Sequence, residues 1–155
     1  MGAHDQLTVR EAGESDVAAV LELWAMARSV HARSADTPEA LERLLADRPG
    51  SLLIAEFKDR VIGALIATWD GWRGNLYRLA VREEHRRRGV ALRLVQEGER
   101  RLAARGARRI SVLAGRDDEM AAGLWTAAGY DRDEKIGRFV KDVPPTDLLR
   151  LRPAR

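Results

Sequence analysis

The order of hydrophobic and polar positions along the chain predicts its strands and helices. Short apolar runs rich in branched side chains indicate strands, and they cover residues 7–12, 51–57, 61–69, 75–81, 108–115 and 137–143. Apolar side chains spaced three and four residues apart indicate helices, over residues 15–33, 37–48, 89–105 and 118–129. The resulting order, β-α-α-β-β-β-α-β-α-β, predicts an α/β (or α+β) fold in which helices pack on a central mixed sheet.

Residues at the predicted boundaries support this division. Ser15 is a candidate N-cap for the first helix. Thr37-Pro38-Glu39 offers the second helix a cap, a proline at the first helical position and an acidic residue. Gly106 stands where a glycine commonly ends a helix. Lys58-Asp59-Arg60 separates two apolar runs and therefore predicts the turn of a hairpin.

Length and composition restrict the class of protein. The 155 residues predict one domain, with residues 144–155 as a loose C-terminal tail. A chain with 45% hydrophobic and 33% charged residues is typical of globular proteins, and it has no run of about 18 apolar residues that would predict a membrane span. The absence of cysteine excludes disulfides and thiolate metal ligands, and the three histidines lack metal-ligand spacing. We therefore expect a cytoplasmic protein with no metal and no membrane partner.

The formal net charge of +3 permits an anionic partner without requiring one. Most of the basic residues are arginines, whose planar guanidinium suits bidentate contacts with phosphate. An alanine- and arginine-rich composition is an equally good explanation for their number. The basic stretches also lack interleaved aromatic residues and a helix with base-reading side chains, so we expect no nucleic-acid partner.

The stretch "EEHRRRGVALRLV", residues 83–95, lies between a predicted strand and a predicted helix. The start of a helix presents unpaired backbone N–H groups and the positive end of the helix dipole, which together bind anions. Gly89 and Ala91 would let phosphate oxygens approach the backbone, and Arg86, Arg87 and Arg88 add positive charge. The pattern therefore predicts a pyrophosphate site, although neither a P-loop nor a Gly-x-Gly-x-x-Gly motif is present.

The segment Arg86-Arg87-Arg88-Gly89-Val90-Ala91 resembles the Arg/Gln-x-x-Gly-x-Gly/Ala signature of the GNAT superfamily of acetyl-CoA-dependent N-acetyltransferases. A later stretch, "DDEMAAGLWTAAGY", is similar to the Asn-x-x-Ala-x-x-Leu-Tyr-x-x-x-Gly-Phe/Tyr helix of that family. The order of elements fits over roughly residues 7–141. The resemblance is to small, single-domain bacterial members.

The resemblance implies a set of cofactor contacts with acetyl-CoA as cosubstrate. The backbone of Leu79, Ala80 and Val81 would pair with the pantetheine arm, and an amide near Leu79 or Val81 would polarise the thioester carbonyl. The pyrophosphate would be held by the segment Arg86, Arg87, Arg88, Gly89, Val90 and Ala91. Asp118 and Trp125 match positions of the later helix that contact the cofactor. The implied reaction is transfer of acetyl to a primary amine by direct attack in a ternary complex.

The catalytic acid and base stay open. Trp125 stands where the family often has a tyrosine acid, and Asn75 stands where some members have a glutamate base. Glu83 and Glu84 lie nearby but are expected to face solvent, and Tyr130 is expected to pack. Trp69, Asp70, Trp72 and His31 are candidates for an acceptor pocket, whereas Trp24 is expected in the core.

These departures from the family pattern leave an alternative function, a non-catalytic acyl-CoA-binding or sensor module. The amine acceptor is either a small molecule or a protein amine. A homodimer is possible because family members commonly dimerise.

Overall fold

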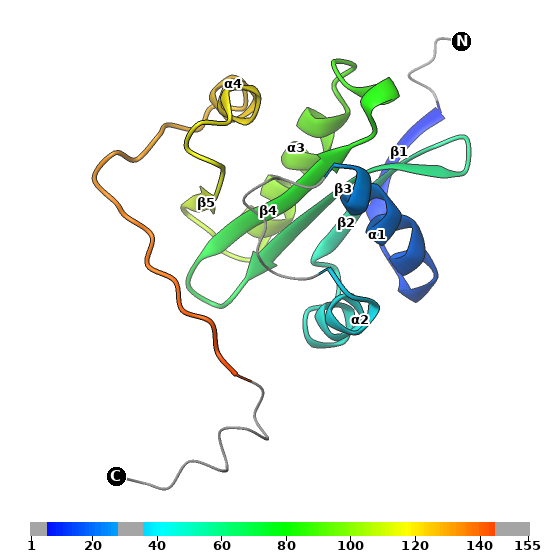
Figure 1. The fold of residues 1–155 in the computed structure, drawn as a ribbon, viewed down its shortest axis with the longest axis horizontal. Coiled ribbons are helices and arrows are strands. Elements are labelled where there is room, and N and C mark those ends of the chain that lie inside the picture. Colours follow the sequence, from blue (N-terminus) through cyan, green and yellow to red (C-terminus); the bar gives the residue numbers. More distant parts are fainter. Residues whose placement is uncertain (1–5, 28–35, 145–155) are drawn as a thin grey trace, which may run out of the picture.

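The computed structural model describes residues 6–27 and 36–144, and a five-stranded sheet in the order β1-β2-β3-β4-β5 lies at its centre (Figure 1). Neighbouring strands are antiparallel except β4 and β5, which are parallel. The elements in chain order are β1 (Leu7–Glu11), α1 (Val17–Met26), α2 (Pro38–Asp47), β2 (Leu52–Phe57), β3 (Arg60–Trp69), β4 (Gly74–Val81), α3 (Val90–Ala104), β5 (Ile110–Val112) and α4 (Glu119–Ala127). The predicted mixed sheet flanked by helices is therefore confirmed.

The predicted hairpin between the second and third strands is also confirmed. Lys58 and Asp59 form its two-residue turn, and both have positive φ angles, 49° and 60°. A two-residue turn with both central residues left-handed matches the twist of the strands it joins. β2 and β3 consequently pair from Phe57 opposite Arg60 to Leu52 opposite Ile66.

Apolar side chains cover both faces of the sheet. One cluster joins α1 and α2 to the sheet, and α3 packs on the opposite face with a second cluster. The residues of α3 that are buried there are Val90, Leu94, Val95, Gly98 and Leu102. Ala91, next to Val90 at the start of the helix, is only partly buried.

Two glycines let α3 lie close to the sheet. A Cβ atom added to Gly63 on β3 would be 2.9 Å from Leu94 Cδ1, and one added to Gly98 on α3 would be 3.1 Å from Leu76 Cδ2. Contacts below about 3.4 Å are tighter than ordinary van der Waals contact between carbon atoms. The close approach fixes α3 beneath β3 and β4, and therefore fixes the start of α3 beside the end of β4.

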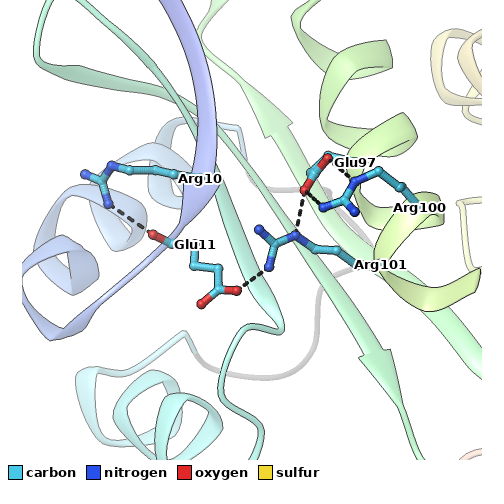
Figure 2. A network of polar contacts seen from close by, with 5 residues as sticks. All are labelled: Arg10, Glu11, Glu97, Arg100 and Arg101. Atoms are coloured by element: carbon cyan, nitrogen blue, oxygen red, sulfur yellow. Dashed lines mark hydrogen bonds and ion pairs between the residues drawn. The ribbon is translucent and has the colours of Figure 1, made fainter. Parts of the chain in front are cut away.

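Polar contacts join the edge strand β1 to α3 (Figure 2). Arg100 donates two hydrogen bonds to the Glu97 carboxylate, at 2.9 and 2.7 Å. Arg101 lies between Glu97, at 2.8 Å, and Glu11 of β1, with which it forms an ion pair. The hydrogen bonds from Arg100, and then those from Arg101, lower the pKa of Glu97 to about 2. Arg100 and Arg101 are therefore engaged in ion pairs, and the pair between Arg101 and Glu11 joins α3 to β1.

The beginning of α1 corrects the prediction that Ser15 is its N-cap. Residues Glu14–Asp16 form a turn of 3-10 helix, and the Asp16 carboxylate accepts the Gly13 N–H at 2.8 Å. Asp16 is also bound by Arg10 at 2.9 and 3.0 Å, and this pairing keeps its pKa below the ordinary value. Asp16 is therefore the residue that precedes α1, but its carboxylate binds Gly13 and Arg10 and caps no N–H group of α1.

The predicted last strand over residues 137–143 is wrong. These residues form no strand, and Ile136, Phe139, Val140 and Val143 are exposed, Phe139 to 98%. A strand requires a partner with free backbone groups, but β5 has only three residues against the eight predicted over 108–115. The segment after α4 instead runs away from the sheet (Figure 1, orange). The tail predicted over residues 144–155 lies outside the described residues except for Pro144.

Candidate functional site

One side of β4 is open over half its length. β5 pairs only with Gly74, Asn75 and Leu76, opposite Ile110, Ser111 and Val112. Beyond Leu76, no other strand in the described parts of the chain pairs with β4 on that side. Figure 1 shows β4 continuing past the end of β5. The stretch 77–81 is therefore a free strand edge next to a parallel neighbour.

A β-bulge lies at the start of this free edge. Tyr77 lies opposite Ile66 and Ala80 opposite Ala64, so Arg78 and Leu79 together face one residue of β3. Arg78 has a φ angle of 57°, in the left-handed region that non-glycine residues rarely adopt. An extra residue in one strand shifts the alternation of its side chains by one position.

The bulge decides which backbone groups of β4 face outward. The Arg82 N–H donates to the Ile62 carbonyl of β3 at 2.8 Å. Since backbone groups in an antiparallel ladder alternate between the two sides of a strand, Ala80 is also directed to β3, while Leu79 and Val81 are directed to the open side. The Arg86 side chain donates its Nε–H to the Val81 carbonyl at 3.1 Å, which agrees with that direction.

The loop that follows β4 places several backbone N–H groups close together in the chain, at residues 87–92. Residues Glu83–His85 form a turn of 3-10 helix, and Arg87 and Gly89 then have left-handed φ angles of 60° and 79°. The first backbone hydrogen bond of α3 runs from the Arg93 N–H to the Gly89 carbonyl at 3.0 Å. No backbone hydrogen bond among the described residues uses the N–H groups of residues 87–92. Left-handed residues next to a helix start turn successive N–H groups toward one point, where they bind anions.

The surroundings of these donors are open and positively charged. No heavy atom lies within 4 Å of the position that a Cβ atom on Gly89 would occupy. The side chains of Arg86, Arg87 and Arg88 are exposed around the loop. The α3 helix has 15 residues, long enough for its dipole to add positive potential at Gly89 and Val90. The sequence predicts the two parts of the site separately, the strand edge at Leu79, Ala80 and Val81 and the anion-binding loop at residues 86–91. In the structure the two parts adjoin one another along the chain at one end of the sheet.

Asp118 and Trp125 lie on the α4 side of the molecule. The Asp118 carboxylate caps α4 by accepting the Ala121 N–H at 3.0 Å. Trp125 is 9% exposed and belongs to the same apolar cluster as Val81 and Val90. The structure therefore gives both residues a structural role, and their contact with the cofactor stays a prediction.

Tyr130 packs as predicted. Its ring meets Trp125 edge to face, with centroids 5.2 Å apart. Its hydroxyl donates to Glu99 of α3 at 2.9 Å. Burial, and then the hydrogen bond to Glu99, raise the pKa of Tyr130 well above its ordinary range. The Tyr130 hydroxyl is thus engaged by Glu99 in a partly buried hydrogen bond.

The other candidate acids and bases lie away from the open edge or face solvent. Asn75 lies in the paired part of β4, opposite Ser111. Glu83 and Glu84 are exposed, and Glu84 lies 3.6 Å from Arg60. A hydrogen bond from its own backbone N–H, followed by nearby positive charge, lowers the pKa of Glu84. The predicted solvent-facing position of both glutamates is confirmed.

The tryptophans divide between core and surface. Trp24 is 5% exposed, so its predicted core position is confirmed. Trp72 is 83% exposed in the β3–β4 loop, at the opposite end of β4 from the loop 82–89. In that loop Asp70 accepts the N–H groups of Trp72 and Arg73 at 2.7 and 2.6 Å, which lowers its pKa. Asp70 and Trp72 therefore do not line the free edge of β4.

Sequence reasoning missed Arg82, and it missed the hydrogen bond that Trp24 makes from the core. Arg82 is 7% exposed, and its Nε–H donates to the Val61 carbonyl at 2.9 Å while its Nη2 lies 3.2 Å from Glu22 of α1. Trp24 donates its indole N–H to the Arg78 carbonyl in the bulge at 3.1 Å. An arginine directly after an apolar strand is the only sequence feature that pointed to Arg82, and nothing local pointed to the bulge.

Several features bear on other kinds of site. Within residues 6–27 and 36–144, no group of three histidine, cysteine, aspartate or glutamate residues is placed to hold a metal ion. His4 and His31 lie outside the described residues. No helix in the described part of the chain is long and apolar enough to cross a membrane. Two shallow surface depressions lie along β1 and β2 and along α2. Neither of these two depressions borders the free edge of β4.

Comparison with known proteins gives a match to the model of the acetyltransferase (GNAT) family over residues 17–130. An aminoglycoside acetyltransferase from an uncultured soil metagenomic sample, solved with sisomicin, is 17% identical; the match covers 92% of this chain and 100% of that one, with a TM-score of 0.73. The aminoglycoside N-acetyltransferase AAC(6')-Iy, solved with CoA, is 17% identical over 92% of this chain and 98% of that one, with a TM-score of 0.72. Ard1 from Thermoplasma volcanium is 18% identical over 80% of this chain and 82% of that one, with a TM-score of 0.71. At these identities the likeness establishes the fold.

Proposed function

The chain belongs to the acetyltransferase (GNAT) family, whose members transfer the acetyl group of acetyl-CoA to an amine, and we propose that the free edge of β4 and the loop 86–91 hold acetyl-CoA for this transfer. The observation that carries the proposal is the row of backbone N–H groups over residues 87–92 that engage no backbone acceptor among the described residues. They follow, after a short loop, a strand edge that no strand covers in the same part of the chain.

The pantetheine arm fits the free edge because it contains amide groups like those of a peptide. A segment with alternating N–H and C=O groups can pair with a strand edge as an added strand would. Leu79 and Val81 direct their backbone groups to this side of β4, as the Arg82 hydrogen bond indicates. Ala80 supplies the intervening residue and directs its own groups toward β3.

The pyrophosphate fits the loop for electrostatic reasons. Backbone N–H groups at a helix start, together with the helix dipole, favour negative charge. Gly89 adds no side chain above these donors, and Arg86, Arg87 and Arg88 lie exposed around them. Val90 and Ala91 contribute the first N–H groups of α3, which have no partner within the helix.

The proposed reaction uses backbone amides and water more than side chains. The nitrogen of a neutral amine attacks the thioester carbonyl, the C–S bond breaks, and CoA leaves as a thiolate that takes up a proton; the amine nitrogen loses one proton to water. An outward amide of Leu79 or Val81 would donate a hydrogen bond to the carbonyl oxygen as negative charge develops on it. Holding both reactants in one place supplies a large part of the acceleration. We propose that protons reach bulk solvent through water at this exposed edge.

The acceptor is proposed as a primary amine of a small molecule or of a protein. The structural relatives include enzymes named for aminoglycoside acetylation and Ard1, which supports an amine acceptor without selecting a class. Residues 28–35, which follow α1, lie outside the described residues. A panel that contains aminoglycosides, polyamines, amino acids and peptides with free N-termini or lysines covers these classes.

The test of the proposed function is a titration of the purified protein with CoA and acetyl-CoA, followed by thiol release across the amine panel. Saturable thermal stabilisation by both ligands, with thiol released in proportion to the amine, is the expected result. Stabilisation without turnover on any amine would favour the acyl-CoA sensor. Absence of stabilisation would contradict the proposed site.

We also propose that the protein forms homodimers in the cytoplasm. The support for a dimer is the run of exposed apolar side chains at Ile136, Phe139, Val140 and Val143, together with the unpaired outer edge of β5 in the described sheet. Sedimentation velocity should show a dimer that Phe139→Ser weakens and the neighbouring Lys141→Ala leaves intact. A monomer at all concentrations would contradict the proposal. The cysteine-free composition is compatible with a cytoplasmic location, which cell fractionation tests.

A further inference from the structure

The free edge of β4 begins at a strained residue, and the contacts around that residue come from outside the strand. Arg78 has a φ angle of 57° inside a strand whose other non-glycine residues have no positive φ angle. L-residues avoid this conformation because Cβ approaches the backbone carbonyl oxygen. The surrounding structure must therefore hold Arg78 in place.

Trp24 holds the backbone of Arg78. Trp24 lies on α1, is 5% exposed and packs in the apolar cluster between α1, α2 and the sheet. Its indole N–H donates to the Arg78 carbonyl at 3.1 Å. The bond joins residues 54 positions apart in the sequence, so it exists only when α1 is docked on the sheet.

The side chain of Arg78 is held by the same group of residues. Its guanidinium lies over the Trp24 ring, 5.7 Å from the ring centroid, in the geometry of a cation–π contact. It also forms an ion pair with Asp36, which precedes α2. Both side chains of the pair are mostly buried, with 24% of the Arg78 and 13% of the Asp36 side chain exposed. Backbone and side chain of Arg78 are thus fixed to α1 and to the start of α2.

The bulge shifts the alternation of the β4 side chains between the two faces of the sheet, and this shift affects the site. Tyr77 packs on the α1 side, and Arg78 contacts Trp24 on the same side; Leu79 packs on the α3 side, and Ala80 on the α1 side again. Two consecutive residues on one side are what a bulge produces. Without the extra residue, Leu79, Ala80 and Val81 would each turn to the opposite face, and their backbone groups would lose their present directions.

We propose that Trp24, with Arg78 and Asp36, forms a clamp that positions the outward backbone groups of Leu79 and Val81. Trp24 is a positioning residue: it acts on the site through the Arg78 carbonyl. The proposal rests on the proposed function only where acetyl-CoA is concerned, because the effect on the strand edge exists with or without a ligand.

The first test compares Trp24→Phe with Trp69→Phe. Trp24→Phe keeps an aromatic ring in the core and removes the indole donor. Trp69→Phe removes an indole from the end of β3, away from the bulge. Amide hydrogen exchange of residues 77–81 should become at least tenfold faster in Trp24→Phe and stay near wild type in Trp69→Phe. The dissociation constant of CoA, measured by calorimetry, should rise about tenfold in Trp24→Phe alone.

The second test addresses the backbone conformation itself and does not depend on the stability of Trp24→Phe. Arg78→Gly and Arg78→Ala both remove the ion pair and the cation–π contact, but only glycine adopts a positive φ angle without strain. Arg78→Gly should therefore bind CoA more tightly than Arg78→Ala, although glycine is the poorer strand former. Introducing Arg78→Gly into Trp24→Phe should restore part of the lost affinity.

The outcomes separate this proposal from the proposed function. If exchange at residues 77–81 is the same in Trp24→Phe and Trp69→Phe, the clamp does not exist, whatever the activity of the enzyme. If Arg78→Ala binds CoA as well as Arg78→Gly does, the left-handed backbone does not position the edge. A wild-type protein that binds no CoA would overturn the proposed function, and the exchange comparison would still decide whether Trp24 holds the strand.

Discussion

Replacing Gly89 by alanine separates the conformational role of this residue from its role in binding. Gly89 is the residue before α3, with φ 79° and ψ 6°. An L-residue in the left-handed region costs about 1–2 kcal/mol. No atom lies within 4 Å of the added Cβ in the free protein, so no steric clash adds to that cost. The free energy of unfolding should fall by about 1–2 kcal/mol, and the melting temperature by roughly 2–8 °C.

The effect of Gly89→Ala on CoA binding should be larger. The added methyl group occupies the open space above the N–H groups of residues 87–92, which the pyrophosphate oxygens must enter. A hydrogen bond to a charged group is worth about 1.5–3 kcal/mol. Losing one of these bonds would weaken binding by about 10- to 150-fold. Glutamate at this position adds negative charge as well, so Gly89→Glu should abolish binding while the fold remains.

The matched control is Gly106→Ala, at the other end of the same helix. Gly106 also has a positive φ angle, 110°, and no atom lies within 4 Å of its would-be Cβ. Gly106→Ala should therefore lose at least as much stability, measured by urea unfolding, but keep the dissociation constant of CoA, measured by calorimetry. If Gly89→Ala binds CoA as tightly as Gly106→Ala does, residues 86–91 are not the pyrophosphate site.

Three further changes test the fold around the site. The pKa of Glu97 is lowered from 4.5 to about 2. Its ionised form therefore stabilises the protein above about pH 4.5, and this contribution is lost as the pH falls through 2. Glu97→Gln should lower the free energy of unfolding by only about 1 kcal/mol at neutral pH, because partly exposed ion pairs are screened by solvent. Urea unfolding should show this difference vanish near pH 2, and a constant difference would contradict it. Gly63→Ala places a Cβ 2.9 Å from Leu94 Cδ1 and 3.3 Å from the Ala80 carbonyl oxygen, so it should destabilise the protein by about 1–3 kcal/mol; unchanged stability would mean that α3 can shift freely. Thr37→Ala removes the acceptor of the Ala40 N–H, 3.1 Å away, and thermal unfolding should show a loss of about 1 kcal/mol, whereas Thr37→Ser should lose less.

Local patterns were sufficient to predict most elements of the fold. The apolar runs of β2 and β3 and the Lys58-Asp59 turn between them depend on neighbouring residues only, and so does the cap of Thr37 on α2. The loop between β4 and α3 was also predictable, because Gly89 and the start of α3 are adjacent in sequence. The left-handed φ angle of Gly89 explains why a glycine stands there. In each case the physical cause lies within a few residues of the pattern.

The bulge in β4 was not predictable for the opposite reason. Arg78 lies in a run of strand-forming residues, and no glycine marks its positive φ angle. The contacts that hold it come from Trp24 and Asp36, which lie 54 and 42 positions earlier in the chain. The failure at residues 137–143 has a related cause, because a pattern that suits a strand says nothing about whether a partner strand is present.

The position of the site follows from the connection between β4 and β5. A parallel pair needs a crossover, and α3 provides it, so the start of α3 must lie where β4 ends. Because β5 pairs only with the first three residues of β4, the uncovered part of β4 is the part nearest to α3. A free strand edge and a helix start therefore adjoin, as a ligand with an amide-containing arm and a pyrophosphate requires. The Arg86 side chain joins the two, since its Nε–H occupies the Val81 carbonyl at 3.1 Å. An amide donor on the ligand that pairs with Val81 would either share this carbonyl oxygen, which has two lone pairs, or replace Arg86. Replacement would free the guanidinium to turn toward the phosphate charge at the adjoining loop.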